Sequence, residues 1–331
     1  MVVLMGGFAV TQMLYVAARL DVADRLARGP VSISELASDC GARPAPLARV
    51  LRALAGFGVF KIEDDGRIAN TSLSDCLRTG ARGSLRELAL VYGEESYHAM
   101  SELLAAVQRG GTAFEHAYRK PHFTYLSNNP DAARAYYDAT NAVAAQAAEG
   151  VVDAYDFTHA GTVVDVAGGQ GHLIRAVLRL NARATGVLIE SSGLARKARA
   201  RVRSEGLDER CDVQTGDVLA SVPRGGDVYL LGNVLHGWDD EHALCILRNC
   251  RRAMAPHARL LVIERLIPEQ PLPAIAEQRI LLSDTVALAV SGGRERTLSE
   301  HSRLLAAADM EVLEVRPTAW GESVIEAGRL G

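Results

Sequence analysis

The residues with the clearest chemical potential surround His236, in the segment 233–241. This segment follows an apolar, strand-like run at 228–231 and precedes a helical pattern that begins at Glu241. Ligands of open parallel sheets bind where strands end, so a histidine here could act as a general base near neutral pH. A lone histidine is usually structural, but its place at this edge favours a catalytic role. The neighbouring acids resemble a magnesium site, yet a helix N-terminus explains them, and we expect no metal.

A glycine-rich loop, DVAGGQG at 165–171, follows the strand-like run 162–166. Glycines let the backbone turn sharply and approach a ligand closely. A nicotinamide dehydrogenase requires GxGxxG, but its last position is Ile174 here, which disfavours that class. Asp165 would repel a pyrophosphate. It suits a ligand with positive charge, such as the ammonium and sulfonium groups of S-adenosylmethionine.

Two further acids lie at the ends of later strand-like runs. Glu190 lies about 20 residues beyond the loop, where a carboxylate can accept hydrogen bonds from both ribose hydroxyls. Asp217 follows the next run and could meet an adenine amino group, with Val218 under the ring. One such acid is often only a helix cap, but three in this order favour a nucleoside cofactor. The predicted cofactor-binding residues are Asp165, Ala167, Gly168, Gly169, Gly171, Glu190, Asp217, Val218 and Asn233.

Two regions of different pattern meet at about residue 150. Beyond it, apolar runs at 162–166, 185–189, 212–215, 228–231 and 260–263 alternate with helical patterns. This order predicts a Rossmann-like, doubly wound α/β domain over 151–331, with a parallel sheet covered on both faces. Residues 1–150 are mainly helical. Three helical patterns and a hairpin at 59–69 predict a winged-helix domain.

The winged-helix pattern has two interpretations, DNA binding and dimerisation. The helix 46–54 carries Arg49 and Arg52 but little else that could contact bases, which favours dimerisation and substrate lining. The basic run 196–203 distributes its charges around a helix, as a solvated surface does. With a net charge of −4, we expect neither a nucleic-acid nor a membrane partner.

The cysteines and the first residues bear on location. The five cysteines include no CxxC pair, which argues against a disulfide framework and a structural zinc site and favours the cytoplasm. The apolar start, residues 1–18, is interrupted by Gly6, Gly7 and Thr11. We expect a helix buried in a core or a subunit interface; the alternative is a signal or anchor. The short lead-in suggests that a native N-terminal stretch is missing.

Six segments together resemble the small-molecule O-methyltransferases typified by plant caffeate and bacterial polyketide-tailoring enzymes. They are DVAGGQG, LIE, GDV, NVLHGWDDEHALCILRNCRRAM, VIERLIPE and SGGRERT. The first half also resembles that family's winged-helix dimerisation domain. The resemblance implies a homodimer that methylates a hydroxyl of a small phenolic, polyketide or aryl acid substrate with S-adenosylmethionine. It further implies His236 as catalytic base, Glu295 as its orienting partner and Glu264 on its other side.

The resemblance also indicates which residues line the acceptor pocket, and the sequence departs from the family pattern at three positions. Phe123, Asn141 and Asp284 fall where the family lines its acceptor pocket. Ala167 replaces the usual first glycine of the loop, Gly232 stands where relatives often carry a basic residue, and Gly237 stands where an aspartate commonly follows the histidine. The alternatives are a non-catalytic methyltransferase-like ligand-binding protein and a winged-helix regulator. The joint presence of a base and two flanking acids disfavours the first, and the acidic balance disfavours the second.

Overall fold

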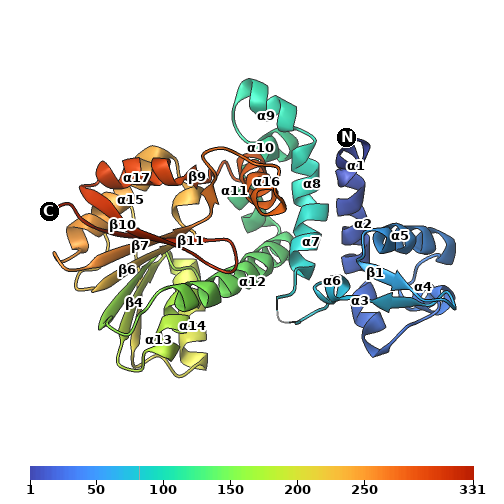
Figure 1. Cartoon of the computed structure of the whole chain (residues 1–331), viewed down its shortest axis with the longest axis horizontal. Coiled ribbons are helices and arrows are strands. Elements are labelled where there is room, and N and C mark those ends of the chain that lie inside the picture. Colours follow the sequence, from blue (N-terminus) through green and yellow to red (C-terminus); the bar gives the residue numbers. More distant parts are fainter. Residues whose placement is uncertain (82) are drawn as a thin grey trace. The chain divides into compact units, whose positions relative to one another are not determined.

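The computed structural model describes residues 1–81 and 83–331, without the side chain of Ala276. The chain forms two compact units, Met1–Val143 and Ala144–Gly331. The division falls inside the long helix α12 (Pro130–Ala154), shown in green in Figure 1. The boundary expected at residue 150 lies in the same helix.

The first unit begins with the predicted helices and hairpin. The elements are α1 (Val2–Met5), α2 (Gly7–Arg19), α3 (Val22–Arg25), the 3₁₀ turn η1 (Leu26–Arg28), α4 (Ile33–Asp39), α5 (Pro44–Gly56), β1 (Phe60–Ile62) and β2 (Ile68–Asn70). The two strands pair antiparallel, with Phe60 opposite Asn70. Leu36, Leu51 and Leu54 are buried with Phe60 in one core. The spacing of the leucines on α5 places them on one helix face, which explains why this helix was predictable.

The rest of the first unit is helical. Its elements are α6 (Ser72–Asp75), α7 (Arg86–Gly93), α8 (Glu95–Met100), α9 (Leu103–Arg109), α10 (Ala113–Tyr118), α11 (His122–Asn128) and the start of α12. At the other end, the apolar side chains of Met1 to Met5 and of Phe8 are exposed, whereas Ala17 and Ala18 are buried. The first residues therefore lie outside the core of this chain, and their place in a subunit interface stays a prediction. None of the described helices meets the length and hydropathy that a membrane span requires.

The second unit contains a seven-stranded sheet. In spatial order the strands are β10 (Met310–Pro317), β11 (Ser323–Arg329), β7 (Arg259–Glu264), β6 (Val228–Gly232), β3 (Thr162–Val166), β4 (Thr185–Glu190) and β5 (Cys211–Thr215). The strands from β7 to β5 are parallel, and the chain order reverses between β3 and β6. Such a reversal separates the loops that leave the two neighbouring strands, and it is where doubly wound sheets bind ligands.

Helices cover both faces of this sheet (Figure 1). One core joins the sheet to α15 (Asp240–Ala253) and α17 (Leu298–Ala306). Two further cores join it to the end of α12, α13 (His172–Leu180) and α14 (Ser192–Ser204). The remaining elements are the 3₁₀ turn η2 (Leu235–Gly237), β8 (Leu266–Ile267), α16 (Ile275–Val290) and β9 (Arg296–Thr297). The doubly wound α/β architecture was thus predicted correctly.

The sheet is mixed rather than wholly parallel. β11 pairs antiparallel with β7, and β10 pairs antiparallel with β11. The last strand predicted from the sequence is 260–263, so β10 and β11 were not predicted. In β10 a bulge between Val312 and Glu314 breaks the two-residue alternation that would identify a half-buried strand.

Candidate functional site

The carboxyl ends of five parallel strands bring the candidate residues to one edge of the sheet. Asp165 is the penultimate residue of β3, and Glu190 and Glu264 end β4 and β7. Asp217 follows β5, and Asn233 follows β6. The register pairs Gly232 of β6 with Ile263 of β7, which places Glu264 beside the loop that carries His236.

The loop after β3 has little room for side chains. A Cβ atom added at Gly168 would overlap the carboxylate of Asp165, whereas one at Gly169 would meet nothing within 4 Å. Gly169 and Gly171 have φ angles of 59° and 76°, which glycine adopts without strain. Ala167 also has a positive φ, 56°. This departure from glycine therefore introduces backbone strain as well as a methyl group.

The acids at this edge have different surroundings. Asp165 is buried, and its Oδ2 has no hydrogen-bond partner among the described residues. Burial, together with the charge of Glu190, raises the pKa of Asp165 to about 7, against the opposing hydrogen bond from Ile174. Glu190 accepts a hydrogen bond from the Gly169 N–H at 3.1 Å. Asp217 is exposed and accepts one from the Leu219 N–H at 2.9 Å.

These features fit S-adenosylmethionine. The unpartnered, buried Asp165 oxygen lacks a positive group, and the open space at Gly169 admits a ligand near the backbone. Glu190 and Asp217 add negative charge along the same edge, and carboxylates can accept further hydrogen bonds. Val218, which follows Asp217 in the chain, packs in the core at this edge of the sheet.

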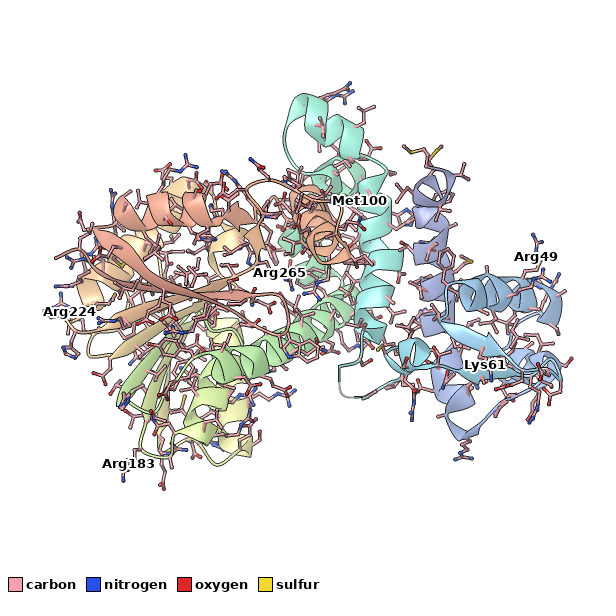
Figure 2. All side chains as sticks on the ribbon, in the orientation of Figure 1. Arg49, Lys61, Met100, Arg183, Arg224 and Arg265 are labelled. Carbon is pink, nitrogen blue, oxygen red and sulfur yellow. The ribbon has the colours of Figure 1, made fainter. Side chains whose placement is uncertain are left out.

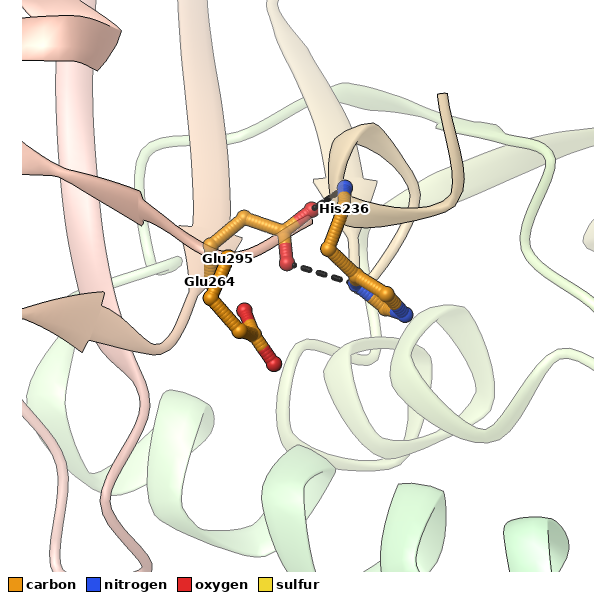
Figure 3. A group of neighbouring side chains, drawn as sticks. All are labelled: His236, Glu264 and Glu295. Atoms are coloured by element: carbon orange, nitrogen blue, oxygen red, sulfur yellow. Dashed lines mark hydrogen bonds and ion pairs between the residues drawn. The ribbon is translucent and has the colours of Figure 1, made fainter. Parts of the chain in front are cut away.

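His236 lies on η2, and Glu264 holds both its ring and its backbone. Glu264 Oε2 lies 2.9 Å from His236 Nδ1. Glu264 Oε1 accepts hydrogen bonds from the N–H groups of Val234, Leu235 and His236, at 2.9, 2.7 and 3.3 Å. The Glu264 side chain is 1% exposed and that of His236 33%, so the carboxylate is buried while the ring keeps access to ligands. Figure 3 shows the contacts of Glu264 with the ring and with the backbone N–H of His236 as dashed lines.

Glu295 lies near this pair without a hydrogen bond to the ring (Figure 3). One ring nitrogen and one oxygen from each carboxylate lie within 4.8 Å of one another, the only group that converges so closely among the described histidine, cysteine and acidic side chains. In the structure the hydrogen bond to the ring comes from Glu264, and the orienting role expected of Glu295 stays a prediction. The Glu295 backbone is fixed by a hydrogen bond from its N–H to Asp284 Oδ1 at 2.9 Å. The three side chains therefore converge on one another, and one of the two carboxylates is hydrogen-bonded to the ring.

The three groups perturb one another. Burial lowers the pKa of His236, but the charge and hydrogen bond of Glu264, with the charge of Glu295, outweigh it and raise that pKa. Burial raises the pKa of Glu264, but the contacts with His236 outweigh it and lower that pKa. Burial raises the pKa of Glu295 to about 7, so this carboxyl is partly protonated at neutral pH. Glu264 is therefore favoured in its charged form beside the ring, whereas Glu295 can also be neutral near neutral pH.

Arg296 is a residue of this site that the sequence analysis missed. It is 1% exposed, and its guanidinium donates to the carbonyls of Leu235 and Trp238 and to Asp240 Oδ1, at 2.7–3.0 Å. Close by, the Arg294 N–H donates to the His236 carbonyl. The position of Arg296 beside Glu295 in the ERT motif was visible, but a sequence pattern does not show which carbonyls an arginine will reach.

The predicted acceptor-lining residues fall in both units. Phe123 and Asn141 belong to the first unit, where the exposed Phe123 ring lies 5.3 Å from that of His122. Asp284 belongs to the second unit, on α16. Of the two departures near the histidine, Gly237 has open space around it. A Cβ at Gly232 would lie 3.2 Å from Leu173.

Comparison with known proteins identifies the family of the chain. Residues 100–311 match the O-methyltransferase domain, and residues 2–80 match the O-methyltransferase dimerisation domain. The chain therefore belongs to the O-methyltransferase family. Since solved relatives carry S-adenosylmethionine or its demethylated product, it is an enzyme that uses S-adenosylmethionine as methyl donor. The predicted fold class and cofactor are thereby confirmed.

Several relatives cover nearly the whole chain. Phenazine O-methyltransferase PhzM of Lysobacter antibioticus is 41% identical, over 97% of this chain and 93% of its own length. The 3-amino-4-hydroxybenzoate 4-O-methyltransferase of Streptomyces cremeus is 34% identical, over 93% and 84%. The structure of the mitomycin 7-O-methyltransferase MmcR superposes with a TM-score of 0.88 at 33% identity, covering 98% of this chain and 96% of that one.

Proposed function

We propose that the enzyme methylates a hydroxyl of a small aromatic molecule, a phenol, polyketide or aryl acid, with His236 as general base. The observation that carries the proposal is the 2.9 Å contact between Glu264 and His236 Nδ1. A carboxylate at Nδ1 favours the tautomer with its proton there, which leaves a lone pair on Nε2. The relatives named for phenazine and aminohydroxybenzoate substrates support an aromatic acceptor.

The chemistry requires little beyond alignment and removal of one proton. When bound, S-adenosylmethionine supplies a methyl carbon activated by the sulfonium. His236 Nε2 would accept the proton that the acceptor hydroxyl loses when its oxygen takes up the methyl group. For a phenol of pKa about 10 and an unperturbed histidine of about 6.5, full deprotonation is uphill by about 5 kcal/mol. The raised pKa of His236 narrows that gap, and a positioned base contributes about 10²–10⁴ in rate.

The cofactor contacts follow from the edge of the sheet. Glu190 would bind the ribose hydroxyls, Asp217 the adenine amino group and Asp165 the positively charged end. The loop of Ala167, Gly168, Gly169 and Gly171, with Asn233 and Val218, would complete the surface around them. The support is the convergence of these residues at the carboxyl ends of adjacent strands.

The enzyme would work as a homodimer in the cytoplasm, on small molecules rather than nucleic acid. The dimerisation domain and the exposed apolar side chains of Met1 to Phe8 support self-association. The five cysteines, all free, suit a reducing compartment. Phe123, Asn141 and Asp284 would contact the acceptor. Light scattering after gel filtration tests the dimer, and a mass of one chain of 35.4 kDa would contradict it.

The decisive experiment compares wild type with His236→Ala and His242→Ala. Methyl transfer from labelled S-adenosylmethionine is measured on hydroxylated benzoates, naphthoates, cinnamates, phenazines and polycyclic phenols. His242 is the matched control because it lies close by in the chain, at the start of α15, is exposed, and contacts Asp239 and the ring of Trp238 among the contacts the structure records. We expect turnover to fall at least 100-fold in His236→Ala alone, with cofactor binding retained. Near-wild-type turnover in that variant would exclude His236 as the base.

A further inference from the structure

Arg175 is a buried arginine on α13 that has no part in the chemistry proposed above. It is 5% exposed, whereas Arg183 and Arg224, two arginines of the same unit that Figure 2 labels, are exposed. An arginine is almost never fully buried unless its guanidinium is paired. The partners of this guanidinium therefore indicate why it is buried.

Two side chains hold the guanidinium of Arg175. Its Nη1 forms an ion pair with Glu205 Oε1, and its Nη2 lies 3.2 Å from His172 Nδ1. Burial and the charges of three nearby arginines lower the pKa of His172 to about 4, so the ring is neutral at neutral pH. Because arginine only donates hydrogen bonds, Nδ1 is the acceptor and the ring carries its proton on Nε2. These two contacts fix the direction in which the remaining nitrogen, Nε, points.

The Nε–H of Arg175 is directed at the glycine-rich loop. It donates to the carbonyl of Gly171 at 3.0 Å, and this carbonyl also accepts the backbone N–H of Arg175 at 3.1 Å. The Gly171 N–H in turn donates to the Gly168 carbonyl at 2.8 Å, and Gly168 lies directly against the Asp165 carboxylate. Contacts therefore lead from Arg175 through the end of the loop to the acid at its start.

Gly171 needs such support because its backbone is left-handed, with φ of 76° and ψ of 30°. Glycine loses more conformational freedom on ordering than any other residue, so a glycine-rich turn is costly to hold in one shape. Nearer the middle of the loop, the Glu190 carboxylate accepts the Gly169 N–H at 3.1 Å. The loop is thus anchored by one side chain near its middle and by another at its end.

We propose that Arg175 is a positioning residue of the cofactor site, whose Nε–H fixes the Gly171 carbonyl and keeps the loop in its binding shape before S-adenosylmethionine arrives. The inference rests on the proposed function, in which this loop binds the cofactor. A preformed loop loses less conformational entropy on binding, which raises affinity without any contact between Arg175 and the ligand. The alternative is that Arg175 only joins α13 to the end of α14 through Glu205, which also pairs with Arg179.

The substitution Arg175→Lys separates these two roles. Lysine keeps a positive charge for Glu205 but has a methylene group where arginine has Nε, so the bond to Gly171 is lost. Arg179→Lys is the matched control, because Arg179 lies on the same helix and pairs with the same Glu205 at 2.8 Å. Among the described residues, no recorded hydrogen bond joins the Arg179 side chain to the loop.

Calorimetry of S-adenosylmethionine binding gives the first readout. The Kd should rise about tenfold or more in Arg175→Lys, as expected for the loss of one charged hydrogen bond, and stay within about twofold in Arg179→Lys. The KM for the cofactor should rise with the Kd while kcat at saturation is retained, because a preformed loop favours the ground state and the transition state alike.

Hydrogen exchange gives a readout that needs neither cofactor nor turnover. In the cofactor-free enzyme, the amides of 168–172 should exchange faster in Arg175→Lys than in wild type and at the wild-type rate in Arg179→Lys. If Arg175→Lys lowers Tm while cofactor Kd and loop exchange match wild type, Arg175 only supports packing and the inference is wrong. An equal loss of cofactor affinity in Arg179→Lys would also overturn it.

A second variant covers the case in which Arg175→Lys does not fold. Arg175→Met with Glu205→Gln removes both charges of the buried pair and leaves neither uncompensated, and it should show the same rise in Kd and in exchange rate. Gly168→Ala tests the loop itself. Unchanged cofactor affinity in that variant would refute the place of the loop in the proposed function, and loop exchange would still decide whether Arg175 holds the loop.

Discussion

Replacing Glu264 with glutamine distinguishes the role of Glu264 from that of Glu295, the other acid beside His236. The glutamine carbonyl can still accept the backbone N–H groups of residues 234–236, which Glu264 Oε1 accepts at 2.7–3.3 Å. The amide nitrogen then faces Nδ1, where the carboxylate oxygen lay at 2.9 Å. Because an amide nitrogen only donates, the ring is driven to the tautomer that carries its proton on Nε2. That nitrogen can then no longer accept the acceptor's proton.

The size of the effect follows from the loss of the base. A positioned general base contributes about 10²–10⁴ in rate, and forcing the wrong histidine tautomer in a serine protease triad, by Asp→Asn, costs about 10⁴. We therefore expect kcat/KM to fall by about 10²–10⁴ in Glu264→Gln, or about 3–5 kcal/mol. Glu295→Gln is the matched control, since Glu295 makes no hydrogen bond to the ring. Its loss should be at least tenfold smaller.

The assay is initial-rate methyl transfer with a labelled donor, at saturating S-adenosylmethionine and on the best acceptor from the panel. Thermal unfolding and calorimetric cofactor binding establish that each variant is folded and loaded. A kcat/KM of Glu264→Gln within fivefold of wild type, with cofactor affinity unchanged, would refute the orienting role of Glu264. An equal or larger loss in Glu295→Gln would return that role to Glu295.

Three further predictions concern the glycine-rich loop. Gly168→Ala should weaken cofactor binding at least tenfold by calorimetry, because its Cβ would overlap the Asp165 carboxylate; unchanged affinity would contradict this. Ala167→Gly should raise Tm by about 1–4 °C, since a left-handed φ costs alanine about 1–2 kcal/mol and glycine's extra chain entropy offsets only part of that; a lower Tm would contradict it. The folded-state pKa of Asp165, about 7, exceeds its unfolded value. The protonated carboxyl therefore stabilises the fold at low pH, and this contribution to the free energy of unfolding is lost as pH rises from about 4 to about 7. In urea titrations without cofactor, Asp165→Asn should therefore lose less stability than wild type between pH 5 and pH 8, and an equal loss would contradict this.

The sequence predicts best those elements whose pattern is local. Leu47, Leu51 and Leu54 recur at helical spacing, and residues 162–166 form a β-branched run; the structure has a helix and a strand there, as predicted. The hairpin of β10 and β11 was missed because its bulge and its partly exposed edge strand weaken the alternation. Its antiparallel attachment to β7 is a long-range pairing that no local signal encodes.

Site residues, too, are predictable where the signal is local and not where it depends on long-range pairing. Strand ends identify Asp165, Glu190 and His236, because the carboxyl edge of a parallel sheet collects such residues whatever the details of packing. The choice between Glu264 and Glu295 as partner of the ring depends on the register of β6 against β7, which sequence does not give. The pairing of Arg175 with Glu205 is similarly hidden, since it joins residues 30 positions apart, one on α13 and one at the end of α14.

The loop of His236 is tied from two directions, its N–H groups to Glu264 and its carbonyls at Leu235 and Trp238 to Arg296. Such a loop has no local opening motion that would expose the amide of Leu235 without breaking a buried ionic network. Its hydrogen exchange should therefore be as slow as that of the central strands, unlike most loops. The ring of His236 is then already ordered before any ligand arrives, so the conformational entropy lost on binding is lost mainly by the acceptor and by the elements that enclose it.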